Sequence, residues 1–200
     1  SDLSFGVAYR GKPLAAEMQY FWKVMVWDQR GAVTAWSSSA NWTMAPHVWT
    51  AKWIAQAGTT NETAEMPVFR HEFVVTKKLA HAVLDVSALG QGEVHLNGAK
   101  VGNAELVPAW TDYRKTIRYD AYDVTAMLRS GRNTLGVMVG NGMFNVVKTP
   151  HRYTKLVNSF GRPMVLLQMR LTYADGTSEV VATDGSWLAA PGPITFSSTY

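Results

Sequence analysis

This 200-residue chain contains no cysteine. It therefore has no disulfide framework, no thiol nucleophile and no cysteine-ligated zinc site. It also lacks a continuous apolar run of about 18 residues, the length that a membrane-spanning helix needs. Charged side chains make up only 17% of the chain, but 47% of it is hydrophobic, a balance that excludes an intrinsically disordered protein. The sequence thus predicts one or two folded domains with no membrane partner.

Clustered positive charge is missing as well. The chain has 19 lysines and arginines against 15 aspartates and glutamates, and the basic residues are scattered along it. Proteins that bind nucleic acids usually gather such residues on one element or face, so we expect no nucleic-acid partner. The motifs of nucleophile elbows, phosphate loops and zinc proteases are absent, and the five histidines show no ligand spacing. The residues alone assign no catalytic group.

The chain does contain many short segments that alternate apolar and polar residues. Residues 92–96 alternate and are followed by Asn97-Gly98, the strongest short signal for a β-hairpin. Residues 164–173 place alternate apolar side chains on one face. Short strands separated by turn residues are typical of a β-sandwich or barrel. Further strands are predicted at residues 20–27, 32–37, 69–75, 80–89, 116–122, 133–139 and 177–183.

One helix and one domain boundary are predicted. The helix spans residues 123–131, because Asp123 is a good N-cap and Gly131 a good terminator. The boundary falls within residues 44–68, where the sequence becomes polar and irregular. The part before it holds two or three strands, too few for an independent sandwich.

Two predicted loops combine aromatic rings with polar side chains. Loops at one end of a sandwich are where binding residues gather. A flat ring beside carboxylate and amide groups suits a sugar, because the ring covers the C–H face and the polar groups take the hydroxyls. The alternative is that these aromatic rings simply cap the sandwich core. The candidate sugar-binding residues are Trp110, Asp112, Tyr113, Asn141, Phe144 and Asn145.

An ordered set of motifs extends over almost the whole chain. The main motifs are Tyr20-x-Trp22-x-Val24-x-Val26-Trp27-Asp28, Trp36-Ser37, Trp53-Ile54, Leu96-Asn97-Gly98, Leu106-x-Pro108-x-Trp110-Thr111-Asp112-Tyr113, Tyr122-Asp123-Val124-Thr125 and Gly140-x-Gly142. Each motif alone is weak, but their order is specific. In this order the set resembles the N-terminal region of bacterial α-L-rhamnosidases, glycoside hydrolase family 78.

The resemblance implies an all-β fold. It implies a β-sandwich of the jelly-roll or galactose-binding type, preceded by a partial immunoglobulin- or fibronectin-like β segment. The expected domains are residues 1–47, a partial fibronectin type III-like segment, and residues 48–200, the rhamnosidase N-terminal sandwich, which is similar to a carbohydrate-binding module. The family's catalytic (α/α) barrel lies after this region, and nothing in the chain matches it. We therefore expect an accessory fragment that is inactive alone and has no catalytic residue.

The resemblance also implies partners and a metal. The partners are a rhamnose-containing oligosaccharide or polysaccharide and the absent C-terminal catalytic domain. The family includes a version of this sandwich in which calcium helps to hold rhamnose, and Asp112, Asn141 and Asn145 are the candidate calcium ligands, since calcium prefers oxygen donors. The chain departs from the family at Met143, where an aromatic residue is usual, and at Ala109, where glycine is usual.

Two other functions stay open. The sandwich could be an interaction or structural module that binds no glycan, or the chain could be a complete small hydrolase with its own carboxylate pair. Enzymes of this family are often exported, so the resemblance favours a secreted or periplasmic location. The predicted strand at residues 20–27 is largely apolar on both faces. We therefore expect residues 1–47 to pack on the second domain or to pair with a second copy of the chain as a homodimer.

Overall fold

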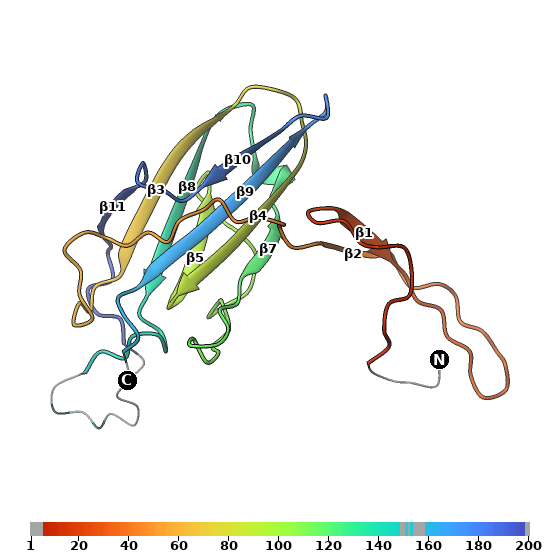
Figure 1. Cartoon of the computed structure of the whole chain (residues 1–200), viewed down its shortest axis with the longest axis horizontal. Helices are drawn as coiled ribbons and strands as arrows, with labels where there is room; N and C mark the ends of the chain where they lie inside the picture. The colour runs from red at the N-terminus through yellow and green to blue at the C-terminus, as the bar shows by residue number, and fades with distance from the viewer. Residues whose placement is uncertain (1–5, 149–150, 152, 154–158, 199–200) are drawn as a thin grey trace. The chain divides into compact units, whose positions relative to one another are not determined.

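The structure of the chain, a computed structural model, describes residues 6–148, 151, 153 and 159–198. Thr199 and Tyr200, at the end of the chain, lie outside the described residues. The chain divides into two units, Ser1–Trp49 and Thr50–Tyr200 (Figure 1). Across the described residues the regular structure is β-strand, with a single 3₁₀ turn and no α-helix. These residues include no helix long and apolar enough to cross a membrane.

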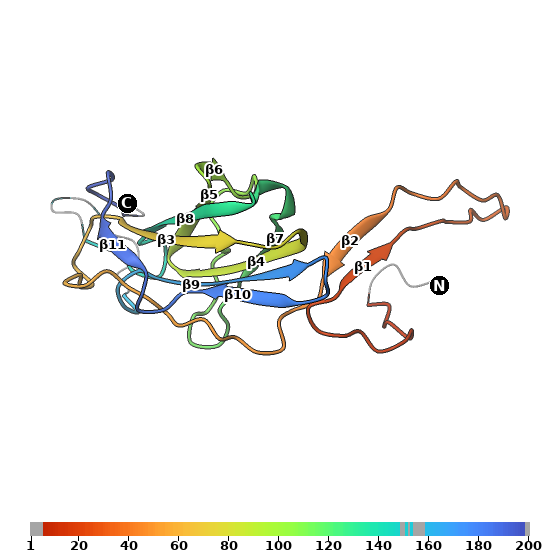
Figure 2. The ribbon, with the colours of Figure 1, turned by 90° about the horizontal axis from the view of Figure 1, so that it is seen from above.

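The larger unit is a sandwich of two antiparallel sheets, which Figure 2 shows as two layers. The prediction of an all-β sandwich is confirmed. The first sheet has the strand order β11-β3-β8-β5-β6 and consists of β3 (Pro67–Val75), β5 (Gln91–Leu96), β6 (Ala99–Lys100), β8 (Gly131–Gly140) and β11 (Leu188–Pro191). The second has the order β10-β9-β4-β7 and consists of β4 (Leu79–Leu89), β7 (Asp120–Asp123), β9 (Met164–Tyr173) and β10 (Ser178–Ala182).

The core forms between the inner faces of these two sheets. On β9 the alternate residues from Val165 to Tyr173 are all buried, as the alternation predicts. They join one cluster with Leu135 and Val137 of β8 and with Leu84 of β4. Burying one such aliphatic side chain stabilises the fold by roughly 1.5–3 kcal/mol. This shared core fixes which face of every strand points outward.

The hairpin between β5 and β6 is confirmed at the predicted place. Asn97 and Gly98 both have positive φ, 54° and 85°, the geometry of the turn that matches the twist of paired strands. The Asn97 side chain also donates to the backbone oxygen of Met127 and to Oδ1 of Asn133. The turn is thereby tied to the segment that precedes β8.

The predicted helix at residues 123–131 is wrong. Only Thr125–Met127 form a 3₁₀ turn, η1. Asp123 is instead the last residue of β7, and its carboxylate accepts hydrogen bonds from the backbone and side chain of Thr125. Val124 is buried, and its N–H donates to the oxygen of Ala82. The Asp123 carboxylate and the Val124 N–H, which would help to begin a helix, are therefore used by the η1 turn and by β4 instead. The predicted strand 116–122 is likewise shifted, to Asp120–Asp123.

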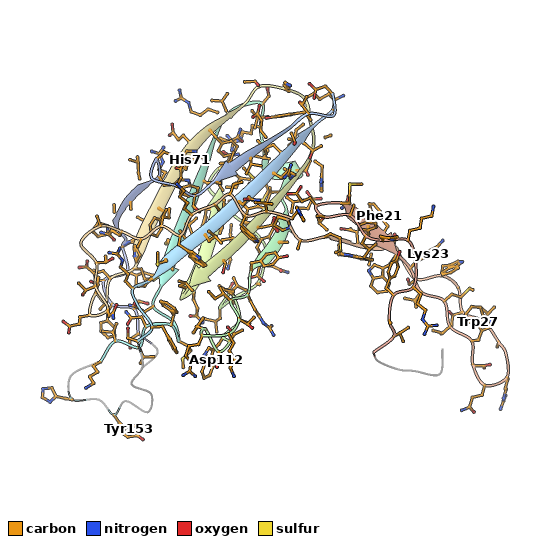
Figure 3. All side chains as sticks on the ribbon, viewed as in Figure 1. Phe21, Lys23, Trp27, His71, Asp112 and Tyr153 are labelled. Carbon is orange, nitrogen blue, oxygen red and sulfur yellow. The ribbon has the colours of Figure 1, made fainter. Side chains whose placement is uncertain are left out.

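The smaller unit is a two-stranded sheet. β1 (Gln19–Trp22) pairs antiparallel with β2 (Ala40–Thr43). Beyond Trp22 the predicted segments 20–27 and 32–37 do not form regular strands. They still pair antiparallel, through a bridge between Trp27 and Val33 and through backbone hydrogen bonds from Asp28 to Ala32, from Thr34 to Val26 and from Ser37 to Val24. The predicted turn between them is confirmed, because the Asp28 carboxylate accepts the N–H groups of Arg30 and Ala32. Large apolar side chains of this unit, Phe21 among them, are exposed (Figure 3).

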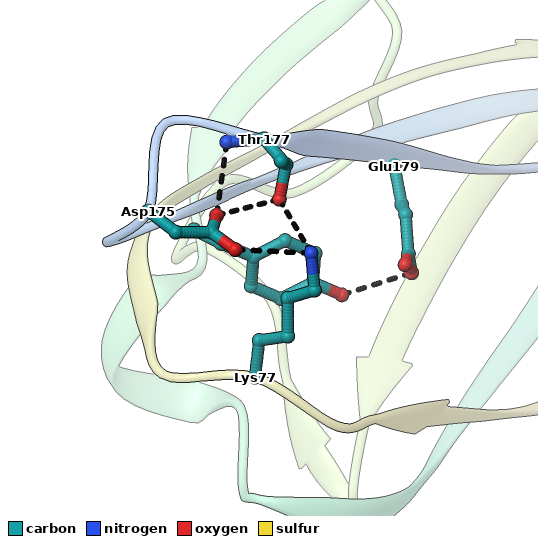
Figure 4. A network of polar contacts seen from close by, with 5 residues as sticks. Lys77, Asp175, Thr177 and Glu179 are labelled. Carbon is teal, nitrogen blue, oxygen red and sulfur yellow. Dashed lines mark hydrogen bonds and ion pairs between the residues drawn. The ribbon is translucent and has the colours of Figure 1, made fainter.

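A polar network joins the β9–β10 turn to the chain between β3 and β4 (Figure 4). The Lys77 ammonium contacts Asp175 at 3.0 Å and the Thr177 hydroxyl at 2.9 Å, and it lies 5.6 Å from the Tyr173 ring centre. Hydrogen bonds from Thr177, reinforced by Lys77, lower the pKa of Asp175 to about 2. Burial and the hydrogen bond to Glu179 raise the pKa of Tyr173 to about 12.

Because the pKa of Asp175 is lowered in the fold, this network stabilises the protein less as the pH falls into the acid range. Asp175 has a folded pKa of about 2, below the value of about 3.9 expected in an unfolded chain. Its contribution is therefore present above about pH 4 and is lost as the pH falls toward 2. We predict that Asp175→Asn lowers the melting temperature at pH 6 and that the difference from wild type shrinks toward pH 2. The control is Glu65→Gln, at an exposed position, which should show no such dependence. Equal losses at both pH values would contradict the prediction.

Candidate functional site

The six predicted sugar-binding residues lie in two loops of the larger unit. One loop, residues 101–119, connects β6 to β7, and the other, residues 141–163, connects β8 to β9. In Figure 3 the labelled Asp112 lies at one end of the sandwich, away from the labelled His71. The structure brings some of these side chains to a shared surface and turns others into the interior.

Trp110 and Asp112 share a surface hollow. This hollow has a volume of about 320 Å³. The Trp110 side chain is 64% exposed, so most of its indole is open to solvent. The hollow is lined by Trp110, Thr111, Asp112, Arg114, Met143, Val146 and Phe160. It thus combines one open aromatic ring with an apolar floor and several polar groups.

Asp112 is held in place by its own turn. Its Oδ1 accepts hydrogen bonds from the backbone N–H of Arg114 at 3.2 Å and from Nε of the same residue at 3.0 Å. The Lys115 ammonium lies 3.6 Å from Oδ2. The Arg114 contacts, with help from Lys115, lower the pKa of Asp112, so this carboxyl is ionised and already paired with cations at neutral pH. The pair presents a hydrogen-bond acceptor and a donor side by side at the hollow.

Tyr113 and Phe144 form an aromatic cluster with Phe160. Tyr113 meets Phe144 edge to face at 5.2 Å and Phe160 at 5.6 Å, and the two phenylalanines lie 5.9 Å apart. Phe144 is buried, and burial raises the pKa of Tyr113. These two rings therefore support the loops from beneath, which is the core-capping alternative for Tyr113. Trp110 does not take part in this cluster's ring contacts among the described residues.

Asn141 and Asn145 form a buried amide pair. Both are fully buried, and Nδ2 of Asn145 donates to Oδ1 of Asn141 at 2.7 Å. Asn141 also donates to the oxygens of Thr63 and Ser197. Asn145 donates to the oxygen of Asn61 and accepts the hydroxyl of Ser159. The pair thus ties together four segments of chain that are far apart in sequence.

The structure does not bring the three candidate calcium ligands together as an open oxygen set. Both asparagine side-chain oxygens already accept a hydrogen bond inside the protein, and Asp112 is paired with Arg114. In the described part of the chain no group of three or more histidines, aspartates or glutamates could hold a metal ion. For sugar contact, burial removes Asn141, Phe144 and Asn145 from the predicted set. Tyr113 is half-buried and packs against Phe144 and Phe160, which leaves Trp110 and Asp112 as the members that line the hollow.

Sequence reasoning missed four residues of the hollow, Thr111, Arg114, Val146 and Phe160. Thr111 and Arg114 stand beside predicted residues, so the turn around Asp112 could have indicated them. Phe160 is some fifty positions further along the chain, and no local pattern connects it to Trp110. Met143, one of the two departures from the family pattern, lines the same hollow.

Comparison with known families matches both units. Residues 77–200 match the family described as the α-L-rhamnosidase N-terminal domain. Residues 1–47 match the Rha78A-like, N-terminal immunoglobulin domain. The matches together cover most of both units of the chain.

Individual relatives are α-L-rhamnosidases. The chain is 32% identical to one from Formosa agariphila, over all of this chain and 24% of that protein. The native enzyme of Aspergillus terreus has a similar structure, with a TM-score of 0.82, 27% identity, and coverage of 95% of this chain and 23% of that one. The Streptomyces avermitilis enzyme complexed with L-rhamnose has a TM-score of 0.56 and 41% identity over 68% of this chain and 13% of that one. The chain spans about a quarter or less of the length of these relatives.

The buried amide pair generates a stability prediction. Asn145→Ala removes three hydrogen bonds and leaves the Asn141 side-chain oxygen unpaired in the interior. Leaving buried polar groups unsatisfied costs about 1–3 kcal/mol, so we expect urea unfolding followed by circular dichroism to show a loss of that size. The control is Asn103→Ala, at an exposed position in loop 101–119. Equal stability of the two variants would show that the amide pair does not hold the loops.

Proposed function

Because this chain belongs to the family of α-L-rhamnosidase N-terminal domains, we propose that it is a non-catalytic, sugar-contacting module of an α-L-rhamnosidase. Its ligand in this proposal is a rhamnose-containing oligosaccharide or polysaccharide. The parent enzyme's catalytic domain supplies the hydrolytic step, and this chain supplies affinity for the glycan. The contact surface is the hollow beside Trp110.

The open indole of Trp110 is the observation that carries this proposal. A tryptophan buries a large area when it is covered, so leaving one 64% exposed beside polar groups favours a role in contact with something outside this chain. A volume of about 320 Å³ also lies at the small end of the range for ligand pockets. Such a hollow accommodates one sugar ring.

The chemistry of a deoxy sugar fits this lining. Rhamnose carries a methyl group and C–H faces, which suit the indole of Trp110 and the thioether of Met143. Its hydroxyls can accept from the Arg114 guanidinium and donate to the Asp112 carboxylate. Because these two groups are already paired with each other, they are fixed in orientation before a ligand arrives. In this proposal Asp112 acts on the sugar directly, without calcium.

A second role is favoured by a different observation. Leu106 is 72% exposed and lies in the same loop as Trp110. Two large exposed apolar side chains in one loop suit contact with a protein surface as well as with a sugar. In that case the loop braces the catalytic domain of the parent enzyme and binds no glycan.

Calorimetric titration of residues 1–200 with L-rhamnose separates these roles. The sugar-contact role predicts measurable binding that Trp110→Ala abolishes or weakens by on the order of tenfold or more, because the contact loses a large apolar side chain whose burial is worth about 1.5–3 kcal/mol. The titration should give the same affinity with calcium and with a chelator.

The matched control is Trp36→Ala, which removes another exposed tryptophan, 53% exposed and in the smaller unit. It should bind L-rhamnose as wild type does. No binding of L-rhamnose or of a rhamnosyl oligosaccharide by wild type would remove the sugar-contact role and leave the bracing role. Binding that requires calcium would contradict the direct contact proposed for Asp112.

A further inference from the structure

A second cavity, of about 130 Å³, lies between the two sheets near strands β6 and β7. Its walls are mostly apolar and include Val86 of β4, Val94 of β5 and Val137 of β8. Loop residues 104–108 line it as well. No residue of this cavity lines the Trp110 hollow, so the two spaces are separate.

Two polar side chains of β7 belong to the inner face of the sandwich at this cavity. In the register of β4 and β7, Asp120 stands opposite Val86 and Tyr122 stands opposite Leu84. Residues directly opposite on paired strands share one face of the sheet, and Leu84 and Val86 belong to the core. Asp120 and Tyr122 therefore point toward the space between the sheets, and both line the cavity.

Asp120 is half-buried, and within the described part of the chain its carboxylate makes no hydrogen bond or ion pair. Burial raises the pKa of this carboxyl, and the positive charge of Arg118 partly opposes that effect. A half-buried carboxylate in apolar surroundings is costly unless a donor reaches it.

The remaining charged groups around the cavity are already paired. Lys100 contacts Glu93 at 3.2 Å and Glu105 at 2.6 Å. The lining therefore contains three carboxylates against one ammonium group, and Asp120 is the carboxylate that Lys100 does not reach in these contacts. Arg118, whose charge acts on Asp120, is a second cationic group near the lining, so three carboxylates face two positive charges. The remaining excess of one negative charge favours a cationic ligand over an anionic one.

We propose that this inter-sheet cavity binds a small organic ammonium compound, with its apolar ring between the valines and its ammonium group on Asp120. An apolar cavity of about 150 Å³ holds a benzene ring, and this space of about 130 Å³ is close to that size. The lining includes the exposed residues Ala104 and Glu105, so the ammonium end of the ligand can extend beyond the enclosed part. The Tyr122 ring forms part of the wall, and the polar end of the ligand meets the carboxylate at the β7 side. This site is independent of the sugar contact proposed for Trp110.

Benzylamine and benzyl alcohol are matched probes for this proposal. They have nearly the same shape, but benzylamine is positively charged at neutral pH. We expect benzylamine to shift amide NMR signals of residues 91–94 and 120–122 in the labelled 200-residue chain. Asp120→Asn should weaken benzylamine on the order of tenfold or more, as expected for a hydrogen bond to a charged group, and should leave the weaker benzyl alcohol unchanged.

Two further variants guard against misinterpretation. Glu65→Gln removes one negative charge at an exposed position outside the cavity and should not change benzylamine binding. Ala104→Phe places a ring at the cavity lining and should block both probes, provided that the amide spectrum elsewhere is unchanged. The proposal is overturned if benzylamine shifts no signal near the cavity, or if wild type and Asp120→Asn bind it equally. Shifts confined to the Trp110 loop would overturn it too.

Discussion

The buried pair of Asn141 and Asn145 is the interaction on which the loop end of the sandwich depends. The two amides lie among segments that the core itself does not hold, and they tie residues 61–63, 159 and 197 to the loop after β8. Each amide group is used by the protein, so the pair gains its stabilisation from a completed set of hydrogen bonds. Loss of Asn145 leaves the Asn141 side-chain oxygen without the hydrogen bond that it accepts inside the protein.

The position of the candidate sugar hollow follows from this constraint. Phe144 lies between the two asparagines in sequence and packs under Tyr113 and Phe160. That cluster supports the loop that carries Trp110, while Met143 contributes to the hollow from the neighbouring position. The Asn141–Asn145 hydrogen bond and the packing of Phe144 against Tyr113 and Phe160 thus hold the two loops, while Trp110 remains exposed. The inter-sheet cavity has a different origin, since it forms where β6 and β7 end the two sheets.

Much of the sandwich could be predicted from sequence because alternation and turn chemistry are local. Val94 and Leu96 point inward, and Asn97-Gly98 turns the chain, through properties of adjacent residues. The helix predicted at residues 123–131 does not form, because long-range hydrogen bonds, such as that from the Val124 N–H to the Ala82 oxygen, outweigh the apparent N-cap at Asp123. Local propensity is a weak guide wherever tertiary contacts compete with it.

The site was harder to predict for a related physical reason. A polar residue in a loop carries no local sign of whether it faces solvent or the interior. Asn141 and Asn145 look like ligands in the sequence, yet their partners at Asn61 and Ser159 become neighbours only in the fold. Trp110 and Asp112 line one hollow because they lie in one tight loop, whereas Phe160 reaches the hollow from another loop.

A crystal structure of this chain with an α-L-rhamnosyl disaccharide tests the central claim most directly. The sugar-contact proposal predicts one rhamnose ring against the exposed face of Trp110, with hydroxyls at Asp112 and Arg114 and with the Asn141–Asn145 pair unchanged. A sugar bound at another surface, a calcium ion bound between the sugar and Asp112, or a Trp110 hollow left empty by a saturating concentration of the disaccharide would contradict it.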